Sequence, residues 1–444
     1  MIARWRWAVG QMTKRLWFRA TLFSLVGVAT ALLAVLFKDV VPPSLPTRIG
    51  ADSVDKILGI IASSMLAVTT FSLSIMVSAY GAASTSVTPR ATQLVMEDST
   101  TQNALATFIG SFLFSLVGII ALSTGLYGAQ GRVVLFAVTL VMVMLIVYTL
   151  LRWIDHLSKL GRMGETIERV ETAAIEALQR RARWPYLGGS RYPDDLTLPA
   201  SATVVASVDT GYVQFVDIKA LGALAHDLQL TIYLEVLPGS FVHLGAPLAR
   251  IVARSPLAPD AAQTLDSRLR QTLTIGARRT FEQDPRFCLS VLGEIASRAL
   301  SPATNDSGTV IDVIGRGLRC LTAWGVRDDE HNAPDEQCRH VHVRGLSTAD
   351  LFDDFFTLVA RDGAGLLEVD IRMTKALISL AEINPEMFRD SCIEHATLLV
   401  KRAGTALKME EEKAKLQAVA ATLLGGATAG PDVSINRLQQ GEPG

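Results

Sequence analysis

Four apolar stretches in the first third of the chain constrain the fold more than any other feature. Each is roughly 20 residues long, the length that a helix needs to cross the hydrocarbon core of a bilayer. They are Trp17–Phe37, Ile57–Ala83, Ala104–Tyr127 and Val133–Trp153, and none has Asp, Glu, Lys or Arg in its middle. Because four such runs in succession are rare in soluble proteins, we expect a four-span transmembrane domain over residues 1–155.

Basic residues beside these stretches predict the orientation of the chain. The first stretch is preceded by Arg4, Arg6, Lys14 and Arg15. The fourth has Arg152 at its end and is followed by Lys159, Arg162 and Arg169. Such residues are retained on the cytoplasmic side of a membrane. A signal peptide would have a shorter apolar region than Trp17–Phe37 and a cleavage site of small residues, and neither feature is evident here. We therefore expect a multi-pass protein whose amino and carboxyl termini are both cytoplasmic.

Small and hydroxyl residues follow one helical face of the second stretch. They are spaced by three or four positions: Ser63, Ala67, Thr70, Ser74, Ser78 and Gly81. The third stretch repeats the pattern with Thr107, Ser111, Ser115 and Gly118. Such a face either packs closely on another helix or lines a water-filled path. We expect the two stripes to pack on each other, and the absence of charge at mid-membrane depth argues against a carboxylate proton relay.

A short polar segment, residues 84–103, joins the second and third stretches. It contains Pro89, Arg90 and Asp98. Proline removes a helical hydrogen bond and restricts the residue before it, so Pro89 marks the end or a kink of the second helix. The segment is therefore expected to form a cytoplasmic hairpin.

The rest of the chain divides by composition and period. We expect a juxtamembrane amphipathic helix at 156–183, a linker at 184–200, a small β module at 201–255, a mainly helical domain at 256–425 and a disordered tail at 426–444. The fold class is thus a transmembrane α-helical domain joined to a cytoplasmic α+β region.

The strings Gly211–Gln214 and Pro238–Leu248 resemble a barrel-sandwich (lipoyl-like) module. Its usual modified lysine is absent from the turn Leu237–Ser240, which favours a structural module over a carrier.

Two polar strings, Arg278–Pro285 and Arg298–Thr309, flank one predicted helix of the cytoplasmic part. Their candidate site residues are Arg279, Asp284, Arg298, Ser301, Asn305 and Asp306. One interpretation is structural, because Ser301-Pro302 ends one helix and Asn305 or Asp306 caps the next. The other is functional: a helix amino terminus beside the arginines binds an anion, or the aspartates bind a cation or exchange protons. No spacing here matches a known nucleophile or metal motif.

Cys338, His340 and His342 alternate along a predicted strand, so their side chains are expected on one face. They are a weak candidate for zinc or copper, but no fourth ligand is evident. The cysteines of the chain are dispersed, which fits reduced thiols rather than a disulfide framework. We expect no metal and no cofactor. The chain has no basic patch with interleaved aromatic residues, so we expect no nucleic-acid partner.

Several of these strings together resemble a known family. They are Phe71-Ser72, Pro89-Arg90, Asp98, Gln102, Phe108–Phe112 and Arg298–Thr309. The chain is similar to a bacterial family of predicted membrane proteins, the domain of unknown function 2254 (DUF2254). It departs from the most specific string of that family at Ser307-Gly308 and at Val310. The resemblance implies four spans, a cytoplasmic domain and a location in the bacterial inner (plasma) membrane, and it implies no established activity.

Two classes of function fit these observations. We favour a homo-oligomeric, channel-like or transport protein that passes an ion or small solute and carries a cytoplasmic assembly or gating domain. Its layout is loosely similar to that of small-conductance mechanosensitive channels, and several subunits are needed because two small-faced helices cannot enclose a pore. The alternative is a membrane-anchored scaffold or sensor that binds a ligand or protein partner through its cytoplasmic domain. A membrane-bound hydrolase is a third hypothesis.

Overall fold

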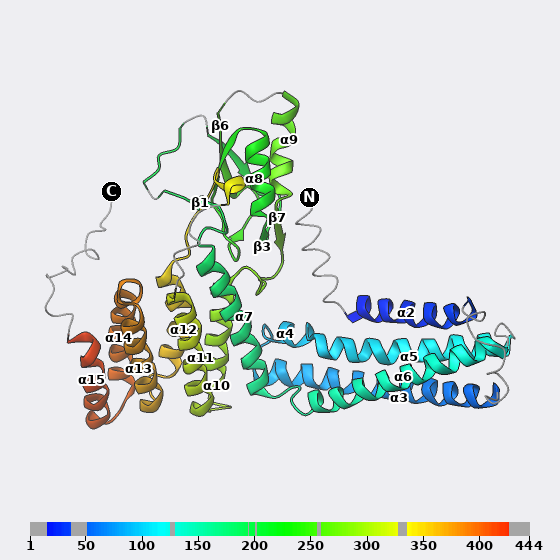
Figure 1. Ribbon diagram of the computed structural model, residues 1–444. Coiled ribbons are helices and arrows are strands. Elements are labelled where there is room, and N and C mark those ends of the chain that lie inside the picture. Colours follow the sequence, from blue (N-terminus) through cyan, green and yellow to red (C-terminus); the bar gives the residue numbers. More distant parts are fainter. Residues whose placement is uncertain are drawn as a thin grey trace. The chain divides into compact units, whose positions relative to one another are not determined.

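A computed structural model describes residues 16–36, 51–124, 129–193, 195–199, 202–254, 259–326 and 335–425 (Figure 1). The chain forms two compact units. The amino-terminal unit ends at Arg169, and the carboxyl-terminal unit begins at Val170. This boundary lies inside the predicted juxtamembrane segment 156–183, and the predicted tail 426–444 lies outside the described residues.

Apolar helices make up the amino-terminal unit. They are α2 (Leu16–Leu36), α3 (Ala51–Ser86), α4 (Thr92–Met96), α5 (Ser99–Ser123) and α6 (Ala129–Leu157). Three segments of the described chain are long and apolar enough to cross a membrane: Ser53–Thr85, Thr92–Ser123 and Gly131–Leu157. The predicted first span corresponds to α2, whose apolar part, Trp17–Thr30, is shorter than a full span. The structure therefore supports several apolar helices and does not confirm the count of four.

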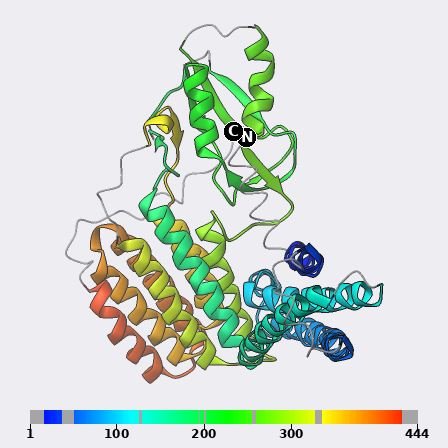
Figure 2. The ribbon, with the colours of Figure 1, turned by 45° about the vertical axis from the view of Figure 1, so that its right-hand side comes forward.

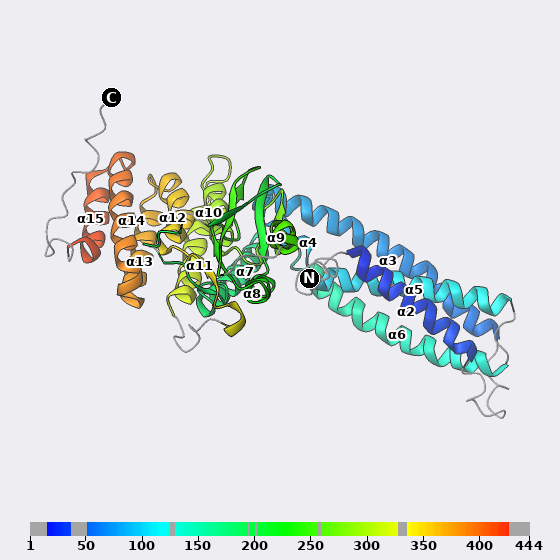
Figure 3. The same cartoon turned by 90° about the horizontal axis from the view of Figure 1, so that it is seen from above.

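Helix α5 is the centre of this unit, and Figure 3 shows it side by side with α2, α3 and α6. Its apolar segment is 56% buried, against 22% for α3 and 17% for α6. Glycines allow α2 to approach it closely. A Cβ atom on Gly27 would lie 2.7 Å from the carbonyl oxygen of Gly110, and one on Gly110 would lie 3.0 Å from that of Phe23. Such backbone contact through small residues is how apolar helices pack tightly in lipid.

The predicted single helix 156–183 is two helices. Helix α6 ends at Leu157, and α7 runs from Met163 to Arg183. Between them Gly161 has a φ of +81°, a conformation that glycine adopts without steric cost. A Cβ there would also lie only 3.2 Å from the side chain of Ala79. The turn therefore breaks a segment whose apolar period alone predicts one continuous helix.

Two sheets form the β region of the carboxyl-terminal unit. The five-stranded sheet has the order β1-β8-β4-β6-β2, and the three-stranded sheet has the order β5-β3-β7. The strands are β1 (Ser190–Arg191), β2 (Thr203–Ala206), β3 (Gly211–Val216), β4 (Leu230–Leu234), β5 (Phe241–Val242), β6 (Pro247–Ala253), β7 (Leu273–Gly276) and β8 (Val341–Val343). Strands β1, β7 and β8 lie outside the predicted module 201–255, and a barrel-sandwich is not confirmed. Helices α8 (Ile218–Asp227) and α9 (Pro259–Arg270), green in Figure 2, contribute Leu221, Leu224, Leu265 and Leu269 to the core of this region.

The remaining elements of the carboxyl-terminal unit are helical, as predicted. They are α10 (Pro285–Ala299), α11 (Ser307–Gly325), the short helix η4 (Glu336–Cys338), α12 (Thr348–Asp362), α13 (Leu367–Ile383), α14 (Pro385–Ala406) and α15 (Glu410–Leu424). Figure 1 shows α10 to α15 standing side by side. Their core contains fully buried aromatic residues, among them Trp324, Phe352, Phe355, Phe356 and Phe388. This packing holds the ends of α10, where the predicted polar residues lie.

Candidate functional site

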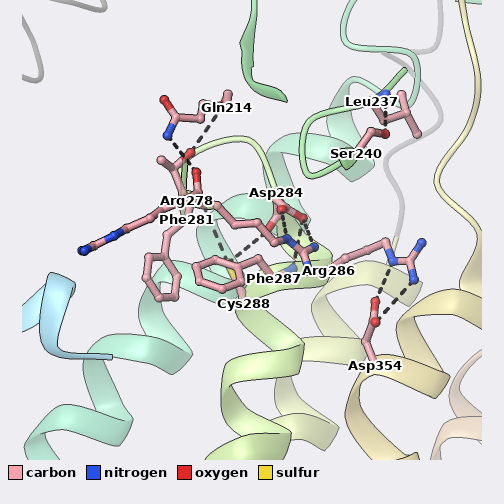
Figure 4. Close-up of polar contacts among 12 residues, drawn as sticks. Gln214, Leu237, Ser240, Arg278, Phe281, Asp284, Arg286, Phe287, Cys288 and Asp354 are labelled. Atoms are coloured by element: carbon pink, nitrogen blue, oxygen red, sulfur yellow. Dashed lines mark hydrogen bonds and ion pairs between the residues drawn. The ribbon is translucent and has the colours of Figure 1, made fainter. Parts of the chain in front are cut away.

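Asp284 lies at the amino terminus of helix α10 (Figure 4), where it forms an ion pair with the half-buried Arg279. Asp284 caps the helix, because its Oδ1 atom accepts a hydrogen bond from the backbone N–H of Phe287 at 3.0 Å. Arg279 donates from Nε to Oδ2 at 2.7 Å and from Nη2 to Oδ1 at 2.9 Å. Only 2% of Asp284 is exposed. Burial raises the pKa of Asp284, and the hydrogen bonds from Arg279 oppose that rise.

A turn of the β region lies directly against this carboxylate. Gly239 has a φ of +94°, and a Cβ atom on it would collide with the Asp284 carboxylate. Ser240 closes the same turn, since its hydroxyl accepts a hydrogen bond from the N–H of Leu237 at 3.1 Å. Only glycine fits this approach. The turn Leu237–Ser240, which resembles the hairpin of a carrier module in sequence, therefore covers a buried aspartate.

A second guanidinium lies near Asp284. Arg181, in the last turn of α7, is 3% exposed, and burial lowers its pKa to about 10 while the charge of Asp284 opposes that fall. Its Nη1 atom has no hydrogen-bond partner among the described residues. The neighbouring Arg180 instead reaches the loop before α10, donating from Nη1 to the carbonyl of Glu282 at 2.7 Å. The buried Arg181 and the half-buried Arg279 thus both act on one buried carboxylate, an arrangement that favours an anion.

The other candidate polar residues lie at the opposite end of α10. Asp306 caps α11 by accepting a hydrogen bond from the N–H of Thr309 at 3.0 Å, and the Thr309 hydrogen bonds lower its pKa. Asn305 is exposed with a φ of +46°, in the left-handed turn between α10 and α11. Ser301 accepts the N–H of Asn305 through its carbonyl at 2.8 Å, and Arg298 lies in the last turn of α10. This end has the geometry of a capped helical corner.

The six predicted residues therefore form two groups rather than one site. Arg279 and Asp284 come together at the start of α10, whereas Arg298, Ser301, Asn305 and Asp306 belong to its end. Helix α10 has 15 residues, which separates the groups by about 20 Å at 1.5 Å per residue. An acid–base pair made of Asp284 and Asp306 is excluded by that separation.

The predicted hairpin brings together a second buried polar cluster, in the amino-terminal unit. Asp98 caps α5, and its carboxylate lies 2.8 Å from His156 Nε2 and 3.0 Å from Arg169 Nη1. Trp153 stacks on His156 with 5.7 Å between ring centroids and donates from Nε1 to the hydroxyl of Ser72 at 2.9 Å. The cluster joins α3, α5, α6 and the first turns of α7. Helix α3 ends at Ser86, before the predicted breaker, and Pro89 and Arg90 are exposed and lie in the turn that follows.

The two hydroxyl stripes lie in different surroundings. Ser63, Ala67, Thr70, Ser74, Ser78 and Gly81 of α3 are all exposed. Thr107, Ser111, Ser115 and Gly118 of α5 are all buried. Helix α3 packs through its other side, which includes Leu58, Ile61, Met65, Met76 and Ala79. The stripes therefore do not pack on each other, although α3 and α5 are neighbours; a Cβ on Gly118 would lie 3.1 Å from Leu58.

Cys338, His340 and His342 do not share a face. Cys338 belongs to η4 and is buried against α8, where a Cβ atom on Gly222 would lie 2.9 Å from its sulfur. His342 stacks on Tyr233 with 4.7 Å between ring centroids, and His340 lies 3.0 Å from Arg254 Nη2. Within the described part of the chain, no group of three His, Cys, Asp or Glu side chains is placed to hold a metal ion.

Comparison with known proteins decides the family. A family model described as "Predicted membrane protein (DUF2254)" matches residues 13–379. The chain belongs to the DUF2254 family. Uncharacterised proteins of Mycobacterium bovis and Mycobacterium tuberculosis are 34% identical to it over 116 residues, which is 26% of this chain and 22% of each relative. No solved structure matches the chain.

The residues matched to DUF2254 include both buried polar clusters, and the family description agrees with a membrane protein that has several apolar helices. The residues of these clusters that are absent from the sequence-based candidates include Arg181, Gly239 and His156. Arg181 is one of three basic residues at a helix end, a pattern that usually indicates solvated cations. Gly239 carries only a turn signal, and His156 follows an apolar run without a motif. Contacts between segments that are distant in the sequence bring these three residues into the clusters. No local sequence pattern indicates those contacts.

Proposed function

We propose that this DUF2254 protein is a homo-oligomeric, channel-like protein of the bacterial inner membrane, with the carboxyl-terminal unit serving assembly or gating. The observation that carries the proposal is the exposed hydroxyl stripe of α3. Within one subunit this stripe lies on the side of α3 opposite its packing residues. A neighbouring subunit, water or both would cover it in the assembly.

Hydrogen bonding along the stripe supports this assignment. The hydroxyls of Ser63 and Thr70 donate to carbonyl oxygens of their own helix, each at 3.0 Å. The hydroxyls of Ser74 and Ser78 have no hydrogen-bond partner among the described residues. An unpaired hydroxyl in hydrocarbon costs on the order of 1–3 kcal/mol. A polar surface beside Ser74 and Ser78 removes that cost, whereas lipid does not.

The contacts of α2 support four spans with both termini in the cytoplasm. Arg19 near the start of α2 donates to Asn103 Oδ1 at 2.8 Å, and Asn103 lies in the first turns of α5. The starts of α2 and α5 therefore lie at one end of the unit, where the contact of Asp98 with His156 also places the end of α6. Lys159 and Arg162 follow at this end, and basic residues favour the cytoplasmic side.

Electrical recording tests the proposal. Purified full-length protein in planar bilayers is expected to conduct, and Ser74→Leu is expected to change unitary conductance because it replaces an exposed hydroxyl of the stripe. Val77→Leu is the matched control, since Val77 is 61% exposed on the same helix and lies outside the stripe. Silence of an intact oligomer would instead support a membrane-anchored scaffold, and equal conductance of both variants would remove the stripe from the pathway.

A further inference from the structure

Arg181 is a buried cation of the helical region that lacks a hydrogen-bonded acceptor among the described residues. Its side chain is 3% exposed, and Nη1 has no hydrogen-bond partner among the described residues. An ion removed from water costs several kcal/mol unless it is paired and hydrogen-bonded. The carbonyl groups at the end of α7 favour a cation nearby, but they accept no hydrogen bond from Nη1.

The nearest acid is already committed to other donors. Asp284 accepts two hydrogen bonds from Arg279 and one from the N–H of Phe287, and Gly239 lies against the same carboxylate. No hydrogen bond joins Asp284 to Arg181. The attraction between the two is therefore electrostatic at longer range, and it leaves the donor of Arg181 without an acceptor.

The carboxylates described around the start of α10 already have cations of their own. Asp284 pairs with Arg279. Arg286 pairs with Asp354 at 2.6 Å and with Asp350 at 2.5 Å, so no direct ion pair with either carboxylate is left for Arg181. The amino terminus of α10 adds the positive end of a helix dipole.

We propose that Arg181, at the amino end of α10, binds a small monatomic anion such as chloride. The orphaned guanidinium N–H supplies a donor, and the charge of Arg181, which forms no direct ion pair with a described carboxylate, supplies the attraction. The site is closed, since Arg181 and Asp284 are almost fully buried and Gly239 covers the carboxylate. A closed site of this kind excludes a bulky ligand such as a nucleotide. The site lies in the carboxyl-terminal unit, and the proposal does not depend on conduction through the membrane.

Thermal unfolding of the purified full-length protein tests the site. Chloride is exchanged for gluconate at constant ionic strength, so screening is the same in every sample. A ligand that binds only the folded state raises the midpoint with the logarithm of its concentration above Kd. The wild-type midpoint is expected to rise with chloride, and that of Arg181→Met is expected to stay constant. Arg183→Met, an exposed arginine of the same helical turn, should respond as the wild type does.

Three results would overturn the proposal: equal wild-type midpoints in chloride and gluconate, an unchanged chloride response in Arg181→Met, or stabilisation by inorganic phosphate without any by chloride. A second measurement needs no variant and covers the case in which Arg181→Met fails to fold. Crystals of the full chain grown in bromide should show an anomalous peak within hydrogen-bonding distance of Arg181. A well-ordered Arg181 without such a peak would contradict the assignment.

Discussion

Helices α3 and α5 carry small and hydroxyl residues at the same helical spacing, yet one set is exposed and the other buried. On α5, Ser111 contacts Met142 of α6 at 3.4 Å, and the position of Gly118 is enclosed by Leu58 and Leu135. On α3, a Cβ atom added to Gly81 would meet nothing within 4 Å. Periodicity therefore identifies a common face but not its neighbour. The buried stripe builds one subunit, and the exposed stripe is available to contact something outside it.

The glycines of the two stripes give the largest expected difference. Gly118→Leu places a side chain against Leu58, and such overpacking is expected to lower the free energy of unfolding by about 3 kcal/mol. Gly81→Leu, the same change on the exposed stripe, should leave the unfolding of a single subunit unchanged. Unfolding of both variants in detergent measures the difference. If Gly81→Leu destabilised the isolated subunit as strongly, the α3 stripe would be an internal packing face.

The same contrast between buried and exposed positions applies to two aspartates of the carboxyl-terminal unit. Asp306 is a partly exposed cap, whereas Asp370 is 1% exposed and neither of its carboxylate oxygens has a hydrogen-bond partner within the described part of the chain. Burial raises the pKa of Asp370 to about 7, above the value of about 3.9 in an unfolded chain. The folded state thus binds this proton more tightly, and stability is lost as pH rises from about 4 through 7.

Asp370→Asn is therefore expected to stabilise the protein at pH 8 by about 2 kcal/mol and to have little effect at pH 4. The measurement is the free energy of unfolding across this pH range. Asp306→Asn is the control with the opposite sign, because hydrogen bonds from Thr309 lower the pKa of Asp306 and its stabilising effect is lost as pH falls. A pH slope that Asp370→Asn leaves unchanged would assign the titration to another group.

Local patterns predict the parts of this fold that depend on neighbours in sequence. The hydrophobic period places the apolar helices, and the polar string after α10 predicts the cap that Asp306 provides. The turn and strand signals near Leu237 predict β4 to β6. Each of these depends on residues a few positions apart, so one sequence suffices to indicate them.

Distant pairings could not be predicted in the same way. Strand β8 joins the sheet beside β1 and β4, with His342 opposite Ser190 and Tyr233. The candidate site divides for the same reason, since α10 separates Asp284 from Asp306 while the chain's topology brings Gly239 onto Asp284. Burial of one stripe and exposure of the other is also a tertiary outcome. The buried and the exposed stripe have the same kinds of side chain at the same spacing, so only tertiary packing distinguishes them.

The polar cluster around Asp98 gives the smallest expected effect and refines the comparison on the α5 side. His156→Ala removes one of several partners of a buried carboxylate, while Arg169 and Thr101 remain bonded to it. We expect a loss of about 1 kcal/mol in the free energy of unfolding, measured in detergent. Lys159→Ala is the control, because its pair with Asp155 is largely exposed, and exposed pairs contribute little. Equal effects of the two variants would show that the cluster is not a structural link between α5 and α6. A larger effect of His156→Ala would show instead that buried polar contacts, together with the small residues of α5, hold the unit together and leave the α3 stripe free for a partner.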